Sequence, residues 1–243
     1  VAGPPTHPRM RMTNRNWVLD SDELSTALNG APVRFINDLN ALARALPHLG
    51  DTDFTVLLEN PPAPDGQRIV AGLGTGYNIA TCLATNPPAF ASAEHGHSYL
   101  SAPIVAMLTQ RIGSKAANCI EAEDLFSGRG LSILDAALND HTPRSPELIF
   151  EGLHTVETDN TLMLFATLFG LHMRDLGYAF MPLGGIYLAG TISRNLISAG
   201  YGPYLCTALQ QPALRGPDLS AIPVSLINRD EAALIGCANT PPR

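Results

Sequence analysis

Hydrophobic and polar positions along the chain follow two periods, and each period predicts a different kind of element. Short apolar runs rich in β-branched residues predict strands, and in the first third they occupy Val33–Ile36, Phe54–Leu58, Ile69–Leu73 and Tyr77–Leu83. Residues 60–66, rich in proline and ending in Asp-Gly, have the composition of a loop. The helical spacing of Leu39–Leu46 predicts a helix that ends at Pro47.

The rest of the chain is predicted to be mainly helical. Apolar residues recur at helical spacing in Ala102–Ile112, Leu131–Asn139, Pro146–Leu153, Glu157–Phe180 and Asp230–Ala238. Gly185–Leu188 and Val224–Ile227 are predicted strands, and Ser193 is a residue type that caps the helix expected to follow the first of them. Strands mixed with helices throughout, without internal repeats, predict α/β or α+β layering.

Composition and charge exclude two classes of partner site. The chain has 243 residues, of which 45% are hydrophobic and 15% charged, so it can bury a substantial core. Its net charge of −7 argues against nucleic-acid binding, which depends on clustered cationic side chains. Lys115 is the only lysine and no Gly-Lys-Ser/Thr triplet occurs, which excludes a Walker-type phosphate loop.

The cysteines and the apolar segments predict a cytoplasmic protein that does not span a membrane. The four cysteines form no Cys-x-x-Cys pair, which favours reduced thiols over disulfides or a zinc site. The longest charge-free apolar stretch, within Asn160–Met173, is shorter than the ~20 residues that span a bilayer. No secretory signal pattern opens the sequence. The first residue is Val1 rather than methionine, which is what a fragment would show.

Asp38 follows one predicted strand and precedes one predicted helix, a position that allows two interpretations. Aspartate is a favoured N-cap, so its carboxylate can accept hydrogen bonds from the first turn of the helix Leu39–Leu46. A carboxylate that faces a cleft at such a junction can instead take a proton from a substrate hydroxyl. The residue type alone leaves both interpretations open.

The glycine-rich residues 72–76 (Gly-Leu-Gly-Thr-Gly) lie between two predicted strands. They fit either a flexible hairpin turn or a nucleotide loop, and Glu94 lies about where a dinucleotide fold would place its ribose-binding acid. That fold requires a helix after the glycines, whereas Tyr77–Leu83 is strand-like. A strand, a glycine turn and a second strand can still form a nest of backbone N–H groups that binds an anion.

A second polar group, Glu94-His95-Gly96-His97, is followed by Glu123 just ahead of Ser127-Gly128. A metal site is not predicted, because adjacent ligands in an irregular loop need further partners that the spacing does not supply. The alternatives are a solvated polar loop and, for Glu123, a solvent-facing helical carboxylate. Glu121 could also be the functional residue in place of Glu123.

The motifs at Asp38, residues 72–76, residues 94–97 and Glu123 occur in this order along the chain. Together they resemble the motifs of the bacterial glucokinase family of the actin-like ATPase and hexokinase superfamily. The resemblance runs from Met12-Thr13-Asn14 and Trp17 to the last predicted helix. It implies an α/β, actin-like ATPase (ribonuclease H-like) fold with two domains. On that basis residues 49–229 form the large domain, and residues 1–48 with 230–243 belong to the small one.

The resemblance also implies an activity: ATP-dependent phosphorylation of glucose to glucose 6-phosphate at the head of glycolysis. Glucose and ATP would be the partners, with Mg²⁺ accompanying the nucleotide, and a homodimer is left open. The implied general base is Asp38. The implied sugar-binding residues are Asn37, Glu94, His97 and Glu123. The implied phosphate-binding and adenosine-binding residues are Gly74, Thr75, Gly76, Gly190 and Thr191.

Some positions depart from the family motifs. Tyr77 and Asn78 replace a Leu-Gly pair, His95 stands where a smaller residue is common, and Thr191 replaces a glycine. The family opens with an Asp-x-Gly-Gly-Thr phosphate loop, which this sequence does not contain. We therefore expect an N-terminally incomplete small domain and little kinase activity from the 243 residues by themselves. The alternative function is a non-catalytic sugar-binding or regulatory protein derived from a sugar kinase.

Overall fold

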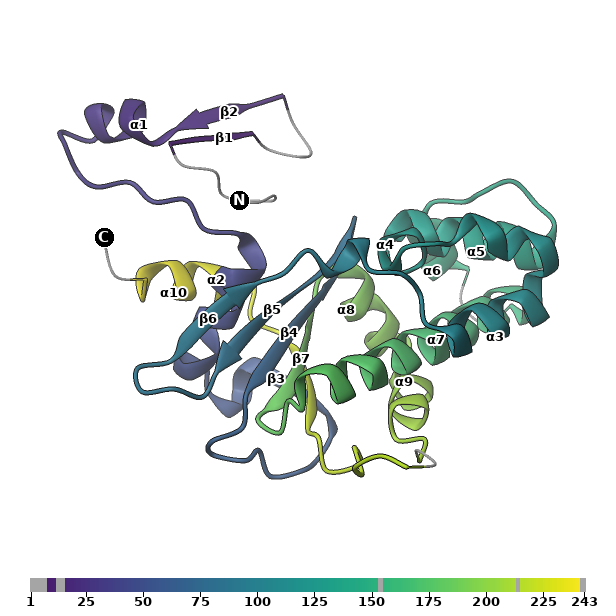
Figure 1. Cartoon of the computed structure of the whole chain (residues 1–243). Coiled ribbons are helices and arrows are strands. Elements are labelled where there is room, and N and C mark those ends of the chain that lie inside the picture. The colour runs from purple at the N-terminus through teal and green to yellow at the C-terminus, as the bar shows by residue number, and fades with distance from the viewer. Residues whose placement is uncertain (1–7, 12–15, 153–154, 213–214, 241–243) are drawn as a thin grey trace.

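The computed structural model describes residues 8–11, 16–152, 155–212 and 215–240, and its centre is a six-stranded mixed sheet (Figure 1). The strand order is β3-β8-β7-β4-β5-β6. Their bounds are β3 (Phe54–Leu58), β4 (Arg68–Leu73), β5 (Tyr77–Leu83), β6 (Ala89–Ser92), β7 (Gly185–Ala189) and β8 (Val224–Ile227). The β4–β7 and β7–β8 pairs are parallel, and the other pairs are antiparallel.

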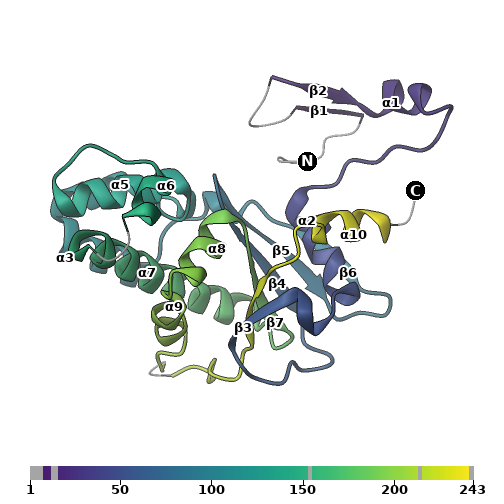
Figure 2. The same ribbon diagram turned by 180° about the vertical axis from the view of Figure 1, so that it is seen from behind.

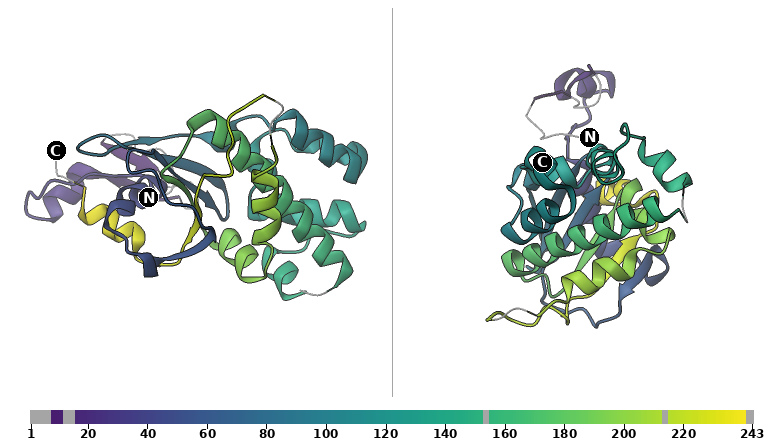
Figure 3. Two further views of the ribbon diagram at one scale, coloured as in Figure 1. Left: turned by 90° about the horizontal axis from the view of Figure 1, so that it is seen from below. Right: turned by 90° about the vertical axis from the view of Figure 1, so that its right-hand side faces the viewer.

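Helices cover both faces of this sheet. The helices are α2 (Asp38–Ala45), α3 (Ala102–Ile112), α4 (Ala122–Leu125), α5 (Gly128–Asn139), α6 (Pro146–Glu151), α7 (Val156–Phe180), α8 (Thr191–Ser198), α9 (Gly202–Leu209) and α10 (Ala232–Ala238). Helices α2 and α10 pack against each other on one face, and the long helix α7 crosses the other (Figures 1 and 2). Helices α3 to α6 lie beyond the sheet, near the first part of α7 (Figure 3).

The side-chain alternation of the central strand β4 explains the two layers. Ile69 and Ala71 belong to the larger hydrophobic cluster, which includes α7 and α9. Val70, between them, belongs to the smaller cluster with residues of α2 and α10. Successive side chains of a strand point to opposite faces, so a strand apolar at every position is buried on both sides.

A small unit, which we call the arm, precedes the sheet. It contains β1 (Arg9–Arg11), β2 (Val18–Asp20) and α1 (Ser21–Ala27), and both strands pair only with each other among the described residues. Figures 1 and 2 show it apart from the sheet, joined to α2 by an extended segment.

The strand predicted at Val33–Ile36 is wrong, because these residues lie in that extended segment and form neither helix nor strand. A strand is stabilised by hydrogen bonds to a neighbour, and within the described part of the chain no strand pairs with this segment.

Several other predicted elements are confirmed to the residue. They are the strands β3, β5 and β8 and the helix α3. Helix α5 begins three residues before the predicted start, and α6 ends at Glu151, with Leu153 outside the described residues. The sequence analysis did not predict β6, α9 or the arm. The motif residues 12–14 lie outside the described part, and the division at residues 48 and 49 stays a prediction.

The helix after β7 begins earlier than predicted, because Gly190 rather than Ser193 is its N-cap. Gly190 has φ of 96°, which favours glycine, and a Cβ there would collide with the carbonyl group of Leu73. Ser193 lies inside the helix and is buried. The turn from β7 into α8 is thereby tight enough to bring the helix start against the end of β4.

None of the helices in the described ranges combines the length and the apolar character needed to cross a bilayer. Helix α7 has 25 residues, but it is packed within the larger hydrophobic cluster.

Candidate functional site

The predicted site residues converge on one cavity of about 630 Å³ at the end of the sheet where β4 turns into β5. Its walls come from the start of α2, the β4–β5 turn, the 3₁₀ turn His95–His97, helix α4, the β7–α8 turn and helix α10. The predicted residues that line it are Asn37, Asp38, Gly74, Thr75, Gly76, Glu94, His97, Glu123 and Gly190. Thr191 is outside this lining but is the first residue of α8.

The sequence left Asp38 as either a helix N-cap or a carboxylate that faces a cleft, and the structure gives the N-cap position to Asn37. Asn37 is the N-cap of α2: its Oδ1 accepts hydrogen bonds from the N–H groups of Leu39 at 2.9 Å and Asn40 at 3.3 Å. Asp38 is the first residue of the helix, is exposed and lines the cavity, although its Oδ1 also accepts from the Leu39 N–H group at 3.0 Å. The N-cap interpretation therefore applies to Asn37, and the Asp38 carboxylate remains open to the cavity.

The glycine turn between β4 and β5 is confirmed as an antiparallel hairpin turn, with Leu73 opposite Tyr77. The N–H group of Gly128, at the start of α5, donates to the Gly74 carbonyl at 2.8 Å. A Cβ atom on Gly74 would lie 3.9 Å from the backbone nitrogen of Thr191, at the start of α8. Two helix N-termini, whose N–H groups and dipoles favour anions, thus flank the turn.

Backbone groups are the donors that this part of the cavity offers to a phosphate. Neither lysine nor arginine is among the described residues that line the cavity. One turn N–H group, that of Gly74, is already used because it donates to the Gly76 carbonyl at 3.0 Å. The N–H groups of Thr75, Gly76 and the first turn of α8 are the remaining candidates for an anion nest.

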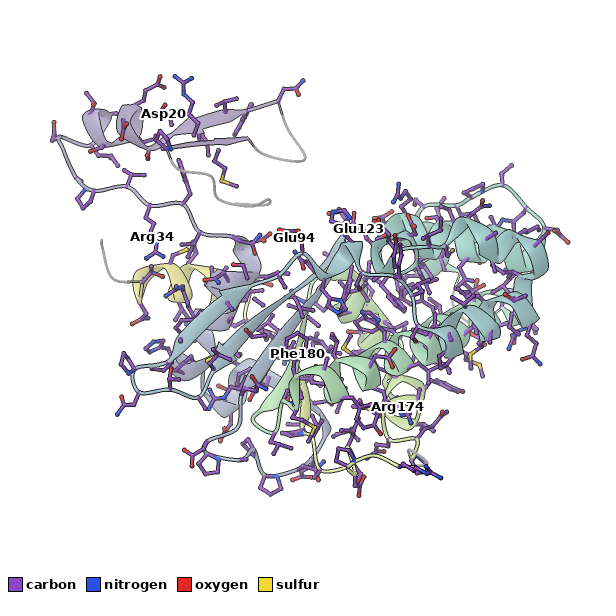
Figure 4. The ribbon with its side chains drawn as sticks, in the orientation of Figure 1. Asp20, Arg34, Glu94, Glu123, Arg174 and Phe180 are labelled. Carbon is purple, nitrogen blue, oxygen red and sulfur yellow. The ribbon has the colours of Figure 1, made fainter. Side chains whose placement is uncertain are left out.

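Glu123 enters the cavity from the short helix α4, and its half-buried carboxylate is held against the glycine turn. Its Oε2 accepts a hydrogen bond from the Tyr77 N–H group at 3.1 Å. A Cβ on Gly96 would collide with the Tyr77 carbonyl oxygen, so glycine is required for the 3₁₀ turn to come this close. Figure 4 shows Glu94 and Glu123 at the same end of the sheet, toward α4.

Glu94 is held by Asn78, one of the residues that depart from the family motif. The Asn78 side chain donates to Glu94 Oε2 at 3.1 Å, and its Oδ1 accepts from the His95 N–H group at 2.9 Å. Asn78 therefore joins strand β5 to the polar loop. The departure from the family's glycine was the only sign in the sequence that this position has a role.

His97 is paired with Glu121, the residue considered as an alternative to Glu123. The His97 Nδ1 atom lies 2.8 Å from Glu121 Oε2. The hydrogen bond and the charge of Glu121, together with the charges of Glu123 and Glu94, raise the pKa of His97. The structure thus places Glu123 in the cavity wall and Glu121 in contact with His97. The sequence offered no basis for choosing between the two glutamates.

A buried aromatic group supports the cavity wall, and the sequence analysis gave it no role. The Tyr77 hydroxyl lies 3.0 Å from His172 Nε2, and the His172 ring packs against Phe126 and His95. Burial raises the pKa of Tyr77. Burial, with a smaller contribution from the charge of His95, lowers the pKa of His172 to about 3, so this imidazole is neutral at pH 7. The only signal in the sequence was a lone histidine in an apolar stretch.

Within the described ranges, no group of three or more histidine, cysteine, aspartate or glutamate side chains could hold a metal ion. The carboxylates that line the cavity, Asp38, Glu94 and Glu123, therefore do not form a metal site by themselves. They fit a magnesium ion that accompanies a nucleotide, because such an ion usually takes only one or two carboxylates from the protein and its other ligands from substrate phosphates.

Comparisons with known proteins found matches over nearly the whole chain. A family model described as glucokinase matches residues 1–241. A glucokinase from Chelativorans sp. (strain BNC1) is 30% identical over 249 residues, which cover 98% of this chain and 72% of that protein. A crystal structure of glucokinase from an Antarctic psychrotroph is similar with a TM-score of 0.83 and 27% identity, covering 98% of this chain and 77% of the other.

A more distant structure shows the same fold. Glucokinase from Balamuthia mandrillaris, crystallised in complex with glucose, has a TM-score of 0.72 and 19% identity, with 97% of this chain and 74% of that chain covered. The predicted fold class is thereby confirmed as the mixed α/β fold of these sugar kinases.

Proposed function

This chain belongs to the glucokinase family, a family of sugar kinases, and we propose on that basis that its cavity binds glucose and ATP and transfers the γ-phosphoryl group to a glucose hydroxyl. The observation that carries the proposal is the convergence of Asp38, Glu94, His97 and Glu123 with the glycine turn on one cavity. Carboxylates and an imidazole suit sugar hydroxyls, and backbone N–H groups suit phosphate.

Asp38 is the proposed general base. It takes the proton of the attacking hydroxyl, whose oxygen forms a bond to the γ-phosphorus as the bond to ADP breaks. The products are glucose 6-phosphate and ADP. Because Asn37 caps the helix, the Asp38 carboxylate does not have to satisfy that helix end alone.

Asn37, Glu94, His97 and Glu123 are proposed to hold the sugar hydroxyls, as the resemblance implied. The glucose complex of the Balamuthia mandrillaris glucokinase supports glucose as the acceptor. Thr75, Gly76, Gly190 and Thr191 would receive the nucleotide, with Gly74 shaping the turn. Mg²⁺ would reach the site with the nucleotide and neutralise phosphate charge.

The proposal predicts the effect of Asp38→Asn in the complete gene product. Turnover should fall by at least about a hundredfold, the usual scale for loss of a general base, while glucose binding persists. A coupled assay for ADP gives kcat, and calorimetry gives the glucose affinity. Near-normal turnover with reduced thermal stability would show instead that the carboxylate serves mainly the helix start.

The proposed activity is tested directly by assaying the complete gene product with several hexoses and nucleotides. Turnover of ~1–100 s⁻¹ supports the kinase. Glucose binding without phosphorylation supports the alternative, a non-catalytic sugar-binding or regulatory protein.

A further inference from the structure

We propose that Glu121 is a positioning residue that fixes the proton on Nδ1 of His97 and thereby presents Nε2 to the cavity. The inference rests on the proposed function for the identity of the ligand, a sugar hydroxyl. It concerns a residue to which neither the family motifs nor the comparisons give a role.

The geometry of the His97–Glu121 pair shows which ring nitrogen carries the hydrogen. An ionised carboxylate only accepts hydrogen bonds, so at a distance of 2.8 Å the Nδ1 atom of His97 must carry the hydrogen. In neutral His97 this leaves the lone pair on Nε2. His97 lines the cavity, and among the described residues no hydrogen bond to Nε2 is formed within the protein. The ring nitrogen that remains for a ligand is therefore Nε2.

The backbone places Glu121 beside His97. The segment after His97 runs antiparallel to the segment before α4, with Tyr99 opposite Glu121. The Leu100 N–H group donates to the Ile120 carbonyl at 3.0 Å, and the Ala122 N–H group donates to the Ser98 carbonyl at 2.8 Å. These bonds do not involve the Glu121 side chain, so substitutions there should leave the backbone pairing intact.

Three carboxylates act on the charge of His97. Glu121 faces His97 from the segment before α4, Glu123 from α4 itself and Glu94 from the loop before the 3₁₀ turn, and all three favour the charged imidazole. Glu121 makes the largest contribution through its hydrogen bond. His97 thus titrates at higher pH than an ordinary histidine, and its Nε2 changes from donor to acceptor as the pH rises through that value.

The exposure of this pair indicates that it contributes little to the stability of the fold. The side chains of His97 and Glu121 are 68% and 40% exposed, and exposed ion pairs contribute little to stability. Substitutions of Glu121 should therefore yield folded protein, so that changes in His97 can be attributed to the lost side chain.

The experiment compares Glu121→Gln and Glu121→Ala with Glu151→Gln, an exposed glutamate on α6 as control. Histidine ¹⁵N spectra of the whole chain, assigned with His97→Gln, report the tautomer and the pKa of His97. Calorimetry at several pH values reports the glucose affinity. Neither measurement requires catalytic turnover.

We expect Glu121→Gln to keep the Nδ1–H tautomer, because the amide oxygen still accepts, and to lower the pKa of His97 by removing the negative charge. Glu121→Ala should lose both the tautomer preference and the raised pKa. It should weaken glucose binding about 3- to 10-fold, the scale of one ordinary hydrogen bond, whereas Glu151→Gln should change neither property.

Two results would overturn the inference. One is an unchanged tautomer and pKa of His97 in Glu121→Ala, and the other is a normal glucose affinity in that variant when the wild-type chain binds glucose. If no variant binds glucose, the proposed function fails, while the spectra still decide whether Glu121 sets the ring nitrogen.

Discussion

Asn37 and Asp38 are adjacent in the sequence, and both line the cavity. Asn37 is the N-cap of α2 and accepts from the N–H groups of Leu39 and Asn40, whereas among the described residues Asp38 accepts only from that of Leu39. Glu121 and Glu123 also differ in their partners: the first contacts His97, and the second contacts the glycine turn. In the proposed site, residues that would contact the ligand are therefore held by hydrogen bonds to neighbouring residues.

Glu123→Gln is expected to weaken sugar binding while nucleotide binding stays unchanged. Glutamine can still accept the Tyr77 N–H group, so the local fold should persist, but a charged acceptor for a sugar hydroxyl is lost. Such a hydrogen bond is typically worth ~1.5–3 kcal/mol, or about 10- to 100-fold in affinity. Calorimetry with glucose and with a nucleotide measures both.

The matched control for this variant is Glu59→Gln, an exposed glutamate just after β3. An equal loss of glucose and nucleotide affinity would contradict the assignment of Glu123 to the sugar. A larger effect from Glu121→Gln than from Glu123→Gln would show that the two residues have exchanged roles.

At the scale of the helices, the buried carboxylate of Asp135 joins the loop after α5 to helix α7 through hydrogen bonds. Asp135, fully buried on α5, accepts hydrogen bonds from Arg144 at 2.9 and 3.0 Å and from the Thr161 hydroxyl on α7 at 3.0 Å. His141 Nε2 also lies 3.2 Å from the same carboxylate. The start of α5 contacts Gly74, so this network stabilises a helix that supports the glycine turn.

We expect Asp135→Leu to lower the free energy of unfolding by about 3–5 kcal/mol, because removing the carboxylate leaves the Arg144 charge without its buried acceptor. Urea unfolding followed by circular dichroism measures the change. Asp140→Asn, which removes an exposed partner of Lys115, should leave the midpoint nearly unchanged. A similar small effect from Asp135→Leu would mean that the network relaxes onto water.

The whole molecule has one large body and an arm that stands apart from it (Figure 1). The body has layers on both faces of the sheet, whereas Trp17, Val18 and Leu28 of the arm are exposed apolar residues. Residues 31–37, which join the two, form neither helix nor strand. Such segments open and are cut more readily than packed elements.

Limited trypsin digestion should therefore cut first after Arg34, in the joining segment (Figure 4). Arg68 and Arg144 should stay uncut at that stage, because β4 and the Asp135 network hold them in the body. Mass spectrometry of the early fragments identifies the site. First cuts inside the body, with residues 31–37 intact, would show that the arm is protected in solution.

The sequence by itself determined many of the elements and the order of the motifs. The strands β3, β5 and β8, the helix α3 and the hairpin around the glycine turn were predictable, because side-chain periodicity and turn residues act over a few positions. The ordered motifs were sufficient to predict the family, which the comparisons confirmed. The role of each site residue stays a prediction from that resemblance.

Only the tertiary structure decided which residues that are distant in the sequence contact one another. Val33–Ile36 has strand composition but no partner strand among the described residues. His172 meets Tyr77, which is 95 positions earlier in the chain, and Glu121 meets His97 through a backbone bridge. These contacts depend on strand order, helix entry angle and close approach at Gly96. Such quantities are set by packing over the whole molecule and leave no period in the local sequence.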